Sequence, residues 1–542
     1  MTDAADHARD VFWADEIAAE IIRRDPEEPI VIKGGISPSG VPHLGNANEI
    51  VLGYFVAEVL RERGYAVRQV YTADDLDPLR RLPRKLADLD GKIVDLGDVD
   101  ASALGRNLGR PYCDIPDPFG CCDSYAQHFT RLIDDISTSL SIPVEVVSTA
   151  ELYRSGAFDD LIETILRNRD TVRSVLATYQ ETVDENFVPF KPHCEACGKE
   201  AGRVTDVNLD RGSVEYRCSD IEVAEGVVQG CGHEGTTTTR GGKLPWRLEW
   251  VAQWAHLGVD FEPFGKDHAE GSWPSGVELA ERVFDIEPPV PFVYEWFTFE
   301  GKPFSSSEGH VVLVSDALDY VEPEVLRYFF ARNPTRSRDF SIERIDQLVD
   351  DFDRLEATAL GHIEPADAGV ASRAERLYPF LVDEIRPGRI RLPYRFAAVL
   401  GMTEDRSLQK QWARQESHLP DGAPPREVDA ALGRVDRARR WARATDNEYN
   451  YSLALEQMPQ VEIDEETANA LEDIAAAVSE SSDGDDIQGA VFEAARRHDI
   501  PVGSLFETGY RLFLDRPDGP KLGPLLGSLE QEFVIERLRR NR

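Results

Sequence analysis

Lysine is scarce in this chain of 542 residues, and it contains no long apolar run. Only ten of its 60 basic residues are lysines, against 99 aspartates and glutamates, and the formal net charge is −39. No stretch approaches the roughly 20 consecutive apolar residues of a membrane-spanning helix. The first residues also lack the basic start and apolar middle of a secretion signal. We therefore expect a soluble, cytoplasmic protein with no membrane partner.

The acidic surplus has two possible explanations. A strongly negative surface normally argues against nucleic acid as a partner. A surplus that is spread over the whole length, with few lysines, is also typical of adaptation to molar salt, where electrostatic interactions are screened within roughly 3 Å. We favour this second explanation. If the surplus is an adaptation to salt, the net charge says little about which partners the protein binds, and only local basic residues are informative.

The N-terminal part alternates strand and helix patterns. A short apolar strand, "PIVIKGG", is followed by a turn rich in glycine and proline. Apolar residues three and four apart then run through "NEIVLGYFVAEVLRERG", which predicts a helix from about Ala47 to Arg63. A second strand, "AVRQVYTADDLDP", ends in acidic residues. This order predicts a βαβ unit and an α/β fold with a Rossmann-like, doubly wound parallel sheet.

Three regions of the chain differ in pattern, as a length that allows two to four domains suggests. We expect a Rossmann-like catalytic domain over residues 1–348 and an all-α region over residues 349–542. Cysteines, glycines and the run "TTTT" set residues 191–241 apart as a small inserted module.

The stretch "GISPSGVPHLGN", residues 35–46, lies between the first strand and the first long helix. At the carboxyl end of a parallel strand, a glycine-rich turn lets a ligand approach the backbone, and the next helix offers its N-terminus to phosphate. His43 stands where it could donate a hydrogen bond to a phosphate oxygen. From the loop alone, a surface turn with a solvated histidine is an equal alternative.

Four cysteines have the spacing of a metal site. "HCEACG" supplies Cys194 and Cys197, and Cys218 and Cys231 follow. A CxxC turn presents two sulfurs to one tetrahedral ion, thiolates suit Zn²⁺, and four protein ligands predict a structural site. His193 or His233 could replace one sulfur. Seven cysteines do not make a disulfide framework, and we interpret Cys113, Cys121 and Cys122 as packing residues.

Two short signatures carry a family resemblance. Pro42, His43, Gly45 and Asn46 resemble the HIGH signature of class I aminoacyl-tRNA synthetases, with Asn46 in place of the final histidine. "GKPFSSSEGH", residues 301–310, resembles the KMSKS signature of the same family. Its cations are largely missing: Pro303 and Phe304 fall on the Lys-Met pair, Ser306 falls on the second lysine, and Lys302 is the one lysine left.

With both signatures in order, the chain resembles archaeal-type class I lysyl-tRNA synthetases, and its acidic composition suggests a halophilic source. The likeness is carried by "WADEIA", "GISPSGVPHLGN", "DPFGCCDSYAQHF", "WAHLGVDFEPFGKDH", "SSSEG" and "GPKLGPLLGSL". The resemblance implies that the lysine carboxylate attacks the α-phosphate of ATP, with Mg²⁺, and that the lysyl group then passes to tRNA(Lys). Such catalysis works by positioning and charge stabilisation, without a protein nucleophile.

The resemblance also implies the site residues. The catalytic set is His43, Asn46, Lys302, Ser305 and Ser307. ATP would be bound by Pro38, Ser39, Gly40, Pro42, His43, Gly45, Asn46, Lys302, Phe304, Ser305, Ser306 and Ser307. The wall of the amino-acid pocket would be Gly35, Ser37, Trp246, His268 and Tyr294, where aromatic faces suit a cationic chain.

The ε-ammonium of a bound lysine also needs acidic partners, because an unpaired buried charge is costly. Asp74, Asp75 and Asp77 at the end of the second strand are the candidates, with Asp267 behind them. A solvated acidic loop is the alternative for each of them.

The helical C-terminal region fits a tRNA-reading domain only through the resemblance. Its candidate phosphate contacts are Arg434, Arg437, Arg439 and Arg440, although spaced arginines on a helix more often form a solvated face. We expect a monomer that binds tRNA and no DNA. The alternatives are a class I synthetase for another amino acid such as glutamate, a small-molecule nucleotidyltransferase, and a non-catalytic tRNA-binding protein.

Overall fold

The protein forms two compact units that interleave along the chain. The computed structural model describes residues 12–223, 226–304, 310–454 and 459–539. The first unit contains Met1–Ala317, Leu326–Phe340 and Ala366–Asp383, and the second contains Leu318–Val325, Ser341–Pro365 and Glu384–Arg542. The sequence predicted one boundary at residue 348, whereas the compact units cross that position in both directions.

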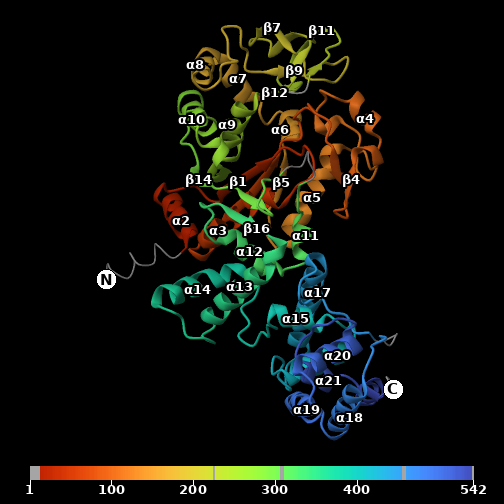
Figure 1. The fold of residues 1–542 in the computed structure, drawn as a ribbon. Helices are drawn as coiled ribbons and strands as arrows, with labels where there is room; N and C mark the ends of the chain where they lie inside the picture. The colour runs from red at the N-terminus through yellow and green to blue at the C-terminus, as the bar shows by residue number, and fades with distance from the viewer. Residues whose placement is uncertain (1–11, 224–225, 305–309, 455–458, 540–542) are drawn as a thin grey trace, which may run out of the picture. The chain divides into compact units, whose positions relative to one another are not determined.

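A five-stranded sheet forms the centre of the first unit (Figure 1). Its order is β14-β13-β1-β2-β5, and every neighbouring pair is parallel. The strands are β1 (Ile30–Ile36), β2 (Val67–Ala73), β5 (Glu145–Ser148), β13 (Val259–Gly265) and β14 (Val290–Tyr294). The chain continues from central β1 to β2 on one side and returns later to β13 on the other. The carboxyl end of β1 is therefore a topological switch point, where such sheets bind ligands, and the predicted fold class is confirmed.

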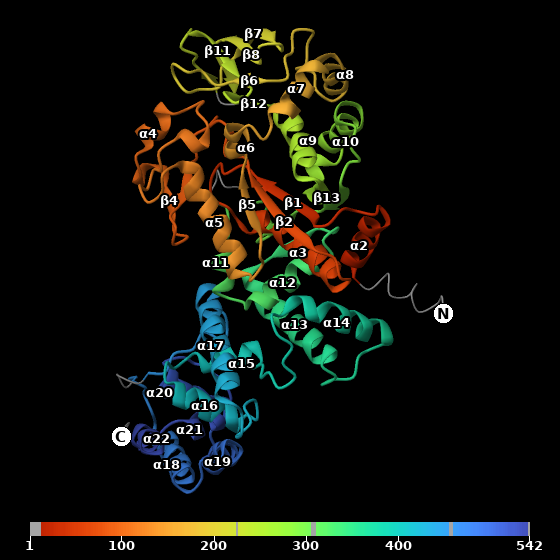
Figure 2. The same cartoon turned by 180° about the vertical axis from the view of Figure 1, so that it is seen from behind.

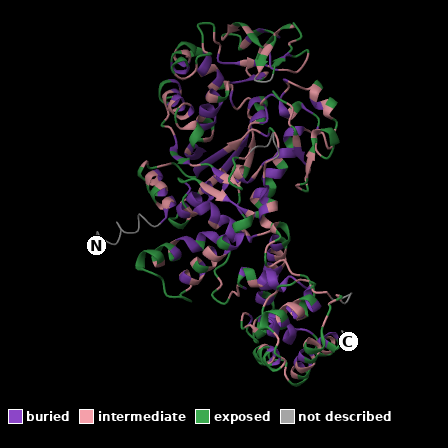
Figure 3. Ribbon diagram, in the orientation of Figure 1, coloured by how far each residue is buried: buried purple, intermediate pink, exposed green. Residues whose placement is uncertain are grey.

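Helix α3 (Ala47–Glu62) links β1 to β2 and is buried on almost every side. Twelve of its sixteen residues are buried (Figure 3), because it packs on β1, β2 and β13 and is covered by α2 (Trp13–Arg23). A helix that is apolar all round belongs to the interior of a large domain. The N-terminus of α3 is thereby fixed at the switch point of the sheet.

Shorter elements surround this centre. Strands β3 (Lys85–Ala87) and β4 (Ile93–Asp95) pair antiparallel, and β15 (Phe297–Phe299) pairs parallel with β16 (Arg338–Phe340). The other helices lying wholly or partly in the first unit are α4 (Ala101–Arg106), α5 (Tyr125–Ser139), α6 (Thr149–Ser155), α7 (Asp159–Arg167), α8 (Arg169–Tyr179), α9 (Trp246–Leu257), α10 (Ser272–Leu279), α11 (Val314–Leu318), α12 (Pro323–Ala331) and α14 (Ala368–Leu381).

The inserted module is built from short antiparallel strands (Figure 2). They are β6 (Lys191–Pro192), β7 (Arg203–Asn208), β8 (Ser213–Arg217), β9 (Ile221–Val223), β10 (Gly226–Val228), β11 (Glu234–Thr238) and β12 (Gly242–Lys243). Its own buried cluster is small and consists of Cys194, Ala201, Tyr216 and Cys218, with Cys197 packed against it. So small a core rarely holds a module together without a metal or disulfides.

The described part of the second unit is helical and contains no strand. Its helices, apart from its shares of α11 and α12, are α13 (Ile345–Ala359), α15 (Tyr394–Leu400), α16 (Arg406–Gln415), α17 (Pro425–Thr445), α18 (Glu465–Glu480), α19 (Gly484–Arg497), α20 (Val502–Leu514), α21 (Leu522–Ser528) and α22 (Gln531–Arg539). Nowhere in the described residues is a helix both long enough and apolar enough to span a bilayer.

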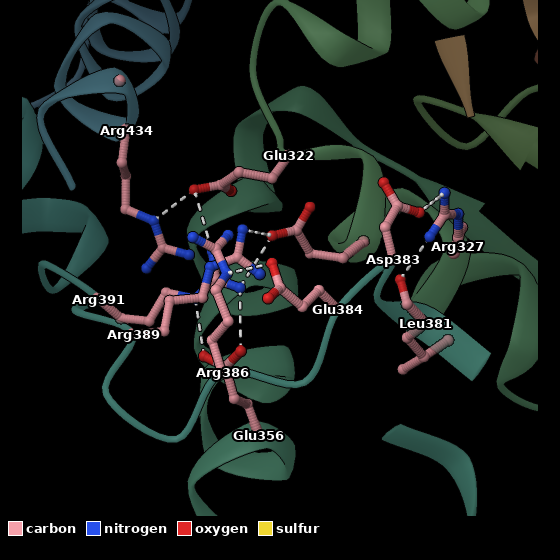
Figure 4. A network of polar contacts seen from close by, with 12 residues as sticks. Glu322, Arg327, Glu356, Leu381, Asp383, Glu384, Arg386, Arg389, Arg391 and Arg434 are labelled. Carbon is pink, nitrogen blue, oxygen red and sulfur yellow. Dashed lines mark hydrogen bonds and ion pairs between the residues drawn. The ribbon is translucent and has the colours of Figure 1, made fainter. Parts of the chain in front are cut away.

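Buried ion pairs join the helices of the second unit (Figure 4). Arg434 of α17 lies within 2.7 Å of Glu322 and also pairs with Asp353 of α13. Arg391 pairs with Glu356 of α13 at 2.7 Å. A charge buried in this way must keep its partners, because removing one of them leaves the other uncompensated.

The four arginines proposed from the sequence as phosphate contacts are therefore engaged within the second unit. Arg434 is buried in the network just described, and Arg437 donates to the backbone carbonyls of Leu318 and Val321. Arg439 and Arg440 form surface ion pairs. Helical spacing alone did not reveal that Arg434 faces inward, because it cannot tell a solvated face from one covered by another helix.

Candidate active site and metal clusters

The turn between β1 and α3 is held by a reciprocal pair of hydrogen bonds. The backbone N–H of Gly45 donates to Nδ1 of His43 over 3.1 Å, and the N–H of His43 donates to Oδ1 of Asn46 over 3.0 Å. A Cβ on residue 45 would lie 2.8 Å from the imidazole, so glycine is required there. Asn46 thus fixes the turn, and His43 begins the short 3-10 helix Leu44–Asn46 that leads into α3.

The imidazole of His43 is neutral and keeps one donor free. Burial lowers the pKa of His43 to about 4. Because Nδ1 accepts a hydrogen bond, the proton of the neutral ring is on Nε2. His43 helps to line a cavity of about 690 Å³. The group is therefore a hydrogen-bond donor to a ligand rather than a counter-charge.

Only part of the second signature belongs to the described residues. Phe304 stacks on His43 with ring centroids 4.7 Å apart, which brings the two signatures together. Lys302 is exposed, and its backbone pairs with that of Phe299 in a tight turn. Ser305, Ser306 and Ser307 lie outside the described residues, so their predicted roles stay predictions.

A smaller cavity of about 310 Å³ opens beside the turn. Six of the eight residues predicted to bind the amino acid line it: Gly35, Ser37, Asp74, Asp77, Trp246 and His268. Its described walls are strongly acidic. Lys33 is the one lysine or arginine among them, and the acids are Glu49, Asp74, Asp77, Glu249 and Glu262.

Three of these five acids have an ammonium partner. Glu262 accepts from Nζ of Lys33 over 2.7 Å. Nζ of Lys243 lies 3.3 Å from Glu249 and also pairs with Asp77. These contacts neutralise part of the acidic wall before any ligand enters.

The other two, Glu49 and Asp74, form no ion pair with any described residue. Glu49 accepts hydrogen bonds from the N–H of Gly35 and the hydroxyl of Tyr294, each over 3.0 Å. Burial raises its pKa to about 7. Asp74 accepts from the amide of Gln253 over 3.0 Å, and burial raises its pKa well above the ordinary value. The cavity therefore presents two half-buried carboxyl groups that a cationic ligand would stabilise in their ionised form.

Two predicted pocket residues lie elsewhere. Asp75 accepts from the backbone N–H of Ala150 over 2.7 Å and from the hydroxyls of Ser148 and Thr149, so it fixes the start of α6. Asp75 is thus held at the start of α6, whereas Asp74, directly after β2, is held by Gln253 of α9. Tyr294 supports Glu49 from behind without lining the cavity. Asp267 accepts from the indole of Trp296.

The larger cavity has walls of the opposite sign. Four of the predicted ATP-binding residues line it: Ser39, Gly40, His43 and Asn46; the predicted residues Pro38, Pro42 and Gly45 belong to the same turn. Its acids are Asp77 and Glu200, and its basic residues are Arg80, Arg81, Lys85, Lys191, Lys243 and Arg247. The two cavities share Ile36, Ser37, Asp77 and Trp246. An acidic pocket and a basic pocket thus meet at the carboxyl end of β1.

The four predicted zinc ligands lie together. The Sγ atoms of Cys194 and Cys231 are 3.6 Å apart, those of Cys197 and Cys218 are 3.7 Å apart, and all four lie within 4.8 Å of one another. Tetrahedral zinc with Zn–S bonds of about 2.3 Å separates its sulfurs by about 3.8 Å, so the arrangement fits the ion. His193 and His233 are not part of this group.

A second cluster was not expected from the sequence. Asp117, Cys121, Cys122 and His128 also place one ligand atom each within 4.8 Å of the others. Nε2 of His128 lies 2.8 Å from the carbonyl of Ala87 and donates to it, which leaves Nδ1 free to face Cys121 at 3.3 Å. Metal-binding histidines are usually oriented by such a second hydrogen bond.

The interpretation of Cys121 as a packing residue is wrong, because Cys121 is exposed; for the half-buried Cys122 it stays a prediction, with metal binding as the alternative. The signal was present in "DPFGCCDSYAQH", where an acid, two cysteines and a histidine fall within twelve residues. Cys113 lies apart from both clusters, and burial raises its pKa to about 12.

Comparison with known proteins identifies the family. The sequence model described as "tRNA synthetases class I (K)" matches residues 11–378. The chain belongs to this family. It is 58% identical to a lysine–tRNA ligase of Halobacterium salinarum over 538 residues, which covers 99% of this chain and 98% of that protein. The identity is also 58% to the corresponding ligase of Natronomonas pharaonis, covering 98% of this chain and 97% of that one. It is 33% to that of Pyrococcus horikoshii, covering 98% and 99%. The predicted resemblance to class I lysyl-tRNA synthetases is confirmed.

Several residues of this class I site were missed in the sequence. Lys33 is the one charged residue of β1, Glu262 is a buried acid within β13, and Glu49 lies in the first turn of the largely buried helix α3. A charge in such a setting is costly unless it is paired or functional. That cost is the signal by which these residues could have been found.

Proposed function

We propose that this class I synthetase activates lysine with ATP and transfers it to tRNA(Lys). The observation that carries the proposal is the meeting of an acidic and a basic cavity at one strand end, with Ser37, Asp77 and Trp246 common to both. The reaction requires lysine, which carries two ammonium groups, and two substrates that carry phosphates, ATP and tRNA. Adjoining cavities of opposite charge would bind lysine next to these phosphates.

Glu49 and Asp74 support lysine as the amino acid. A carboxylate that is partly buried without a cation is destabilised, and lysine brings an α-ammonium and an ε-ammonium to two such groups. The rings of Trp246, Trp250 and His268 suit its aliphatic stem and positive end. A bound glutamate would instead add a further unpaired carboxylate to this wall, which argues against the glutamate alternative.

The basic cavity supports phosphate chemistry. The lysine carboxylate oxygen attacks the α-phosphorus of ATP, a P–O bond forms, and the bond to pyrophosphate breaks. A terminal ribose hydroxyl of tRNA then attacks the carbonyl carbon of the adenylate, and AMP leaves. His43 would donate from Nε2 to a phosphate oxygen as charge develops, next to the N-terminus of α3. Mg²⁺ arrives with the ATP phosphates and offsets their charge.

Lys302, Ser305, Ser306 and Ser307 would close over the phosphates from the side of Phe304, as the family signature implies. Because this loop has a single lysine, we propose that cations of the basic cavity, such as Arg80, Lys85 and Arg247, supply part of the positive charge. The further proposals that the enzyme is monomeric and cytoplasmic and that its helical unit reads tRNA rest on the family resemblance.

We propose that Cys194, Cys197, Cys218 and Cys231 hold zinc. Four thiolates leave no open position, so the ion would stabilise the inserted module rather than react. The donor set of Asp117, Cys121, Cys122 and His128 fits zinc equally well, and it would tie the start of α5 to the loop before it.

The experiment is aminoacylation at several KCl concentrations with ATP, Mg²⁺, total archaeal tRNA and each of the twenty amino acids. We expect tRNA to be charged with lysine in preference to glutamate, arginine and cysteine. Charging with another amino acid would refute the pocket assignment and retain the synthetase. No charging at any salt concentration would favour the nucleotidyltransferase or the non-catalytic alternative. Transfer RNA must be present, because related class I enzymes can need it to activate their amino acid.

A further inference from the structure

The exposure of side chains along α9 shows which end of the acidic cavity is open and which is deep. Three tryptophans one turn apart become steadily more buried: Trp246 is 43% exposed, Trp250 is 7% exposed and Trp254 is 1% exposed. Trp246 and Trp250 line the cavity, and the indole of Trp254 donates to Glu262, which also lines it. Strand β1 gives the same order, since Ser37 belongs to both cavities and Lys33, four residues earlier, is 2% exposed. The open end is therefore at Ser37 and Trp246, and the floor is at Lys33.

The floor is a charged cluster. Glu262 accepts from Nζ of Lys33 over 2.7 Å, from the indole of Trp250 over 2.8 Å and from the indole of Trp254. These contacts join β1, β13 and α9 beneath the cavity. The carboxylate of Glu262 already accepts from three donors, so a ligand would have to compete with them for it.

The ammonium of Lys33 has N–H groups that Glu262 does not use. An ammonium has three N–H groups, and Glu262 is its one partner among the described residues. Lys33 also acts on the two unpaired acids: burial raises the pKa of Glu49 and Asp74, and the Lys33 ammonium opposes both shifts. The Lys33 ammonium thus lies at the deep end of a pocket whose other charged residues are acidic.

We infer that Lys33 determines the specificity of the pocket by setting its depth. Its ammonium closes the floor and repels the cationic end of any side chain that reaches further than that of lysine. This inference rests on the proposed function and names what separates lysine from arginine in that same site. Arginine is longer and ends in a guanidinium that would meet Lys33 with no unpaired acid left beyond it. A shorter cation, such as that of ornithine, would leave space above the floor.

The test uses two paired variants, because removing Lys33 alone would leave Glu262 as an uncompensated buried charge. Lys33→Ala/Glu262→Gln opens space and removes both charges. Lys33→Met/Glu262→Gln removes the charges and keeps the length, and is the matched control. The two indoles donate to different oxygens of Glu262, and glutamine has one acceptor oxygen, so one indole contact is lost in both variants alike and the comparison between them stays matched. Aminoacylation with lysine, arginine and ornithine gives kcat/KM for each, and thermal unfolding monitors the fold.

We expect the alanine variant to raise the ratio of kcat/KM for arginine over lysine by on the order of tenfold or more, and the methionine variant to raise it less. The kcat/KM for lysine should fall, mainly because KM rises.

An unchanged ratio in both variants, with folded protein, would overturn the inference and leave Lys33 a structural partner of Glu262. If both variants unfold, Lys33→Arg decides: its longer cation should shift preference from lysine towards ornithine, and no shift would overturn the inference. Failure of the unmodified enzyme to charge lysine would instead refute the proposed function.

Discussion

The imidazole of His43 and the phenyl ring of Phe304 stack nearly in parallel, with centroids 4.7 Å apart and planes 13° apart. The first residue belongs to the turn after β1, and the second precedes the serine-rich loop. This contact links the two phosphate signatures and covers one face of the His43 ring.

Replacing His43 tests its role as a donor. We expect His43→Ala to lower kcat by on the order of 10²-fold, because a donor that acts on developing phosphate charge is worth most in the transition state. Lysine binding and thermal unfolding should change little. The measurement is the single-turnover rate of charging. An unaltered rate would mean that the turn has been misinterpreted.

Glu49 predicts a pH dependence. Its pKa is about 7 in the free pocket, so it is neutral below pH 7 and ionised above it, and only the ionised form attracts an ammonium. We therefore expect kcat/KM for lysine to rise as the pH increases through 7. The rise should disappear in Glu49→Gln and persist in His268→Gln, a control in the same wall that leaves Glu49 in place. A flat profile between pH 6 and 8 in the unmodified enzyme would contradict the assignment.

The two clusters predict about two zinc ions per chain, measured by elemental analysis of freshly reduced, folded protein. Cys197→Ser and Cys121→Ser should each remove about one ion. Cys113→Ser is the matched control, since Cys113 lies outside both clusters, and it should retain both ions. Loss of the Cys197 ion should destabilise the inserted module first, visible as faster hydrogen exchange in β7, β8 and β11. A chain that binds no metal would remove the role proposed for the cysteines.

The acidic surplus predicts salt dependence. With a formal charge of −39, self-repulsion is strong in dilute buffer and is screened in concentrated salt. Charging activity and the unfolding temperature should both rise with KCl towards molar concentrations, although salt also weakens each direct contact with tRNA phosphates. Full activity and stability in dilute buffer would exclude salt adaptation.

The sequence revealed those features that consecutive residues determine. The turn at 35–46 and the CxxC pair are local patterns, and the structure gathers their residues as expected. The floor of the pocket was not predicted, because Lys33 and Glu262 are 229 positions apart and meet only when β13 pairs with β1. Asp75 was misassigned because its partners at the start of α6 are distant in the sequence. The sequence left open whether Arg434 faces solvent or the interior, because it does not show which helices cover α17.

The pairing of β15 with β16 constrains how the enzyme can be made. Phe297–Phe299 lead towards the serine-rich loop, yet their partner strand, Arg338–Phe340, emerges from the ribosome about forty residues later. Arg376 of α14, which pairs with Asp15 and Glu62 of the first unit, follows later still. A nascent chain of some 320 residues therefore contains both signatures but not the strand that fixes the path into the second one. Completion of the catalytic unit during synthesis must wait for segments that the ribosome adds after it has begun the helical unit.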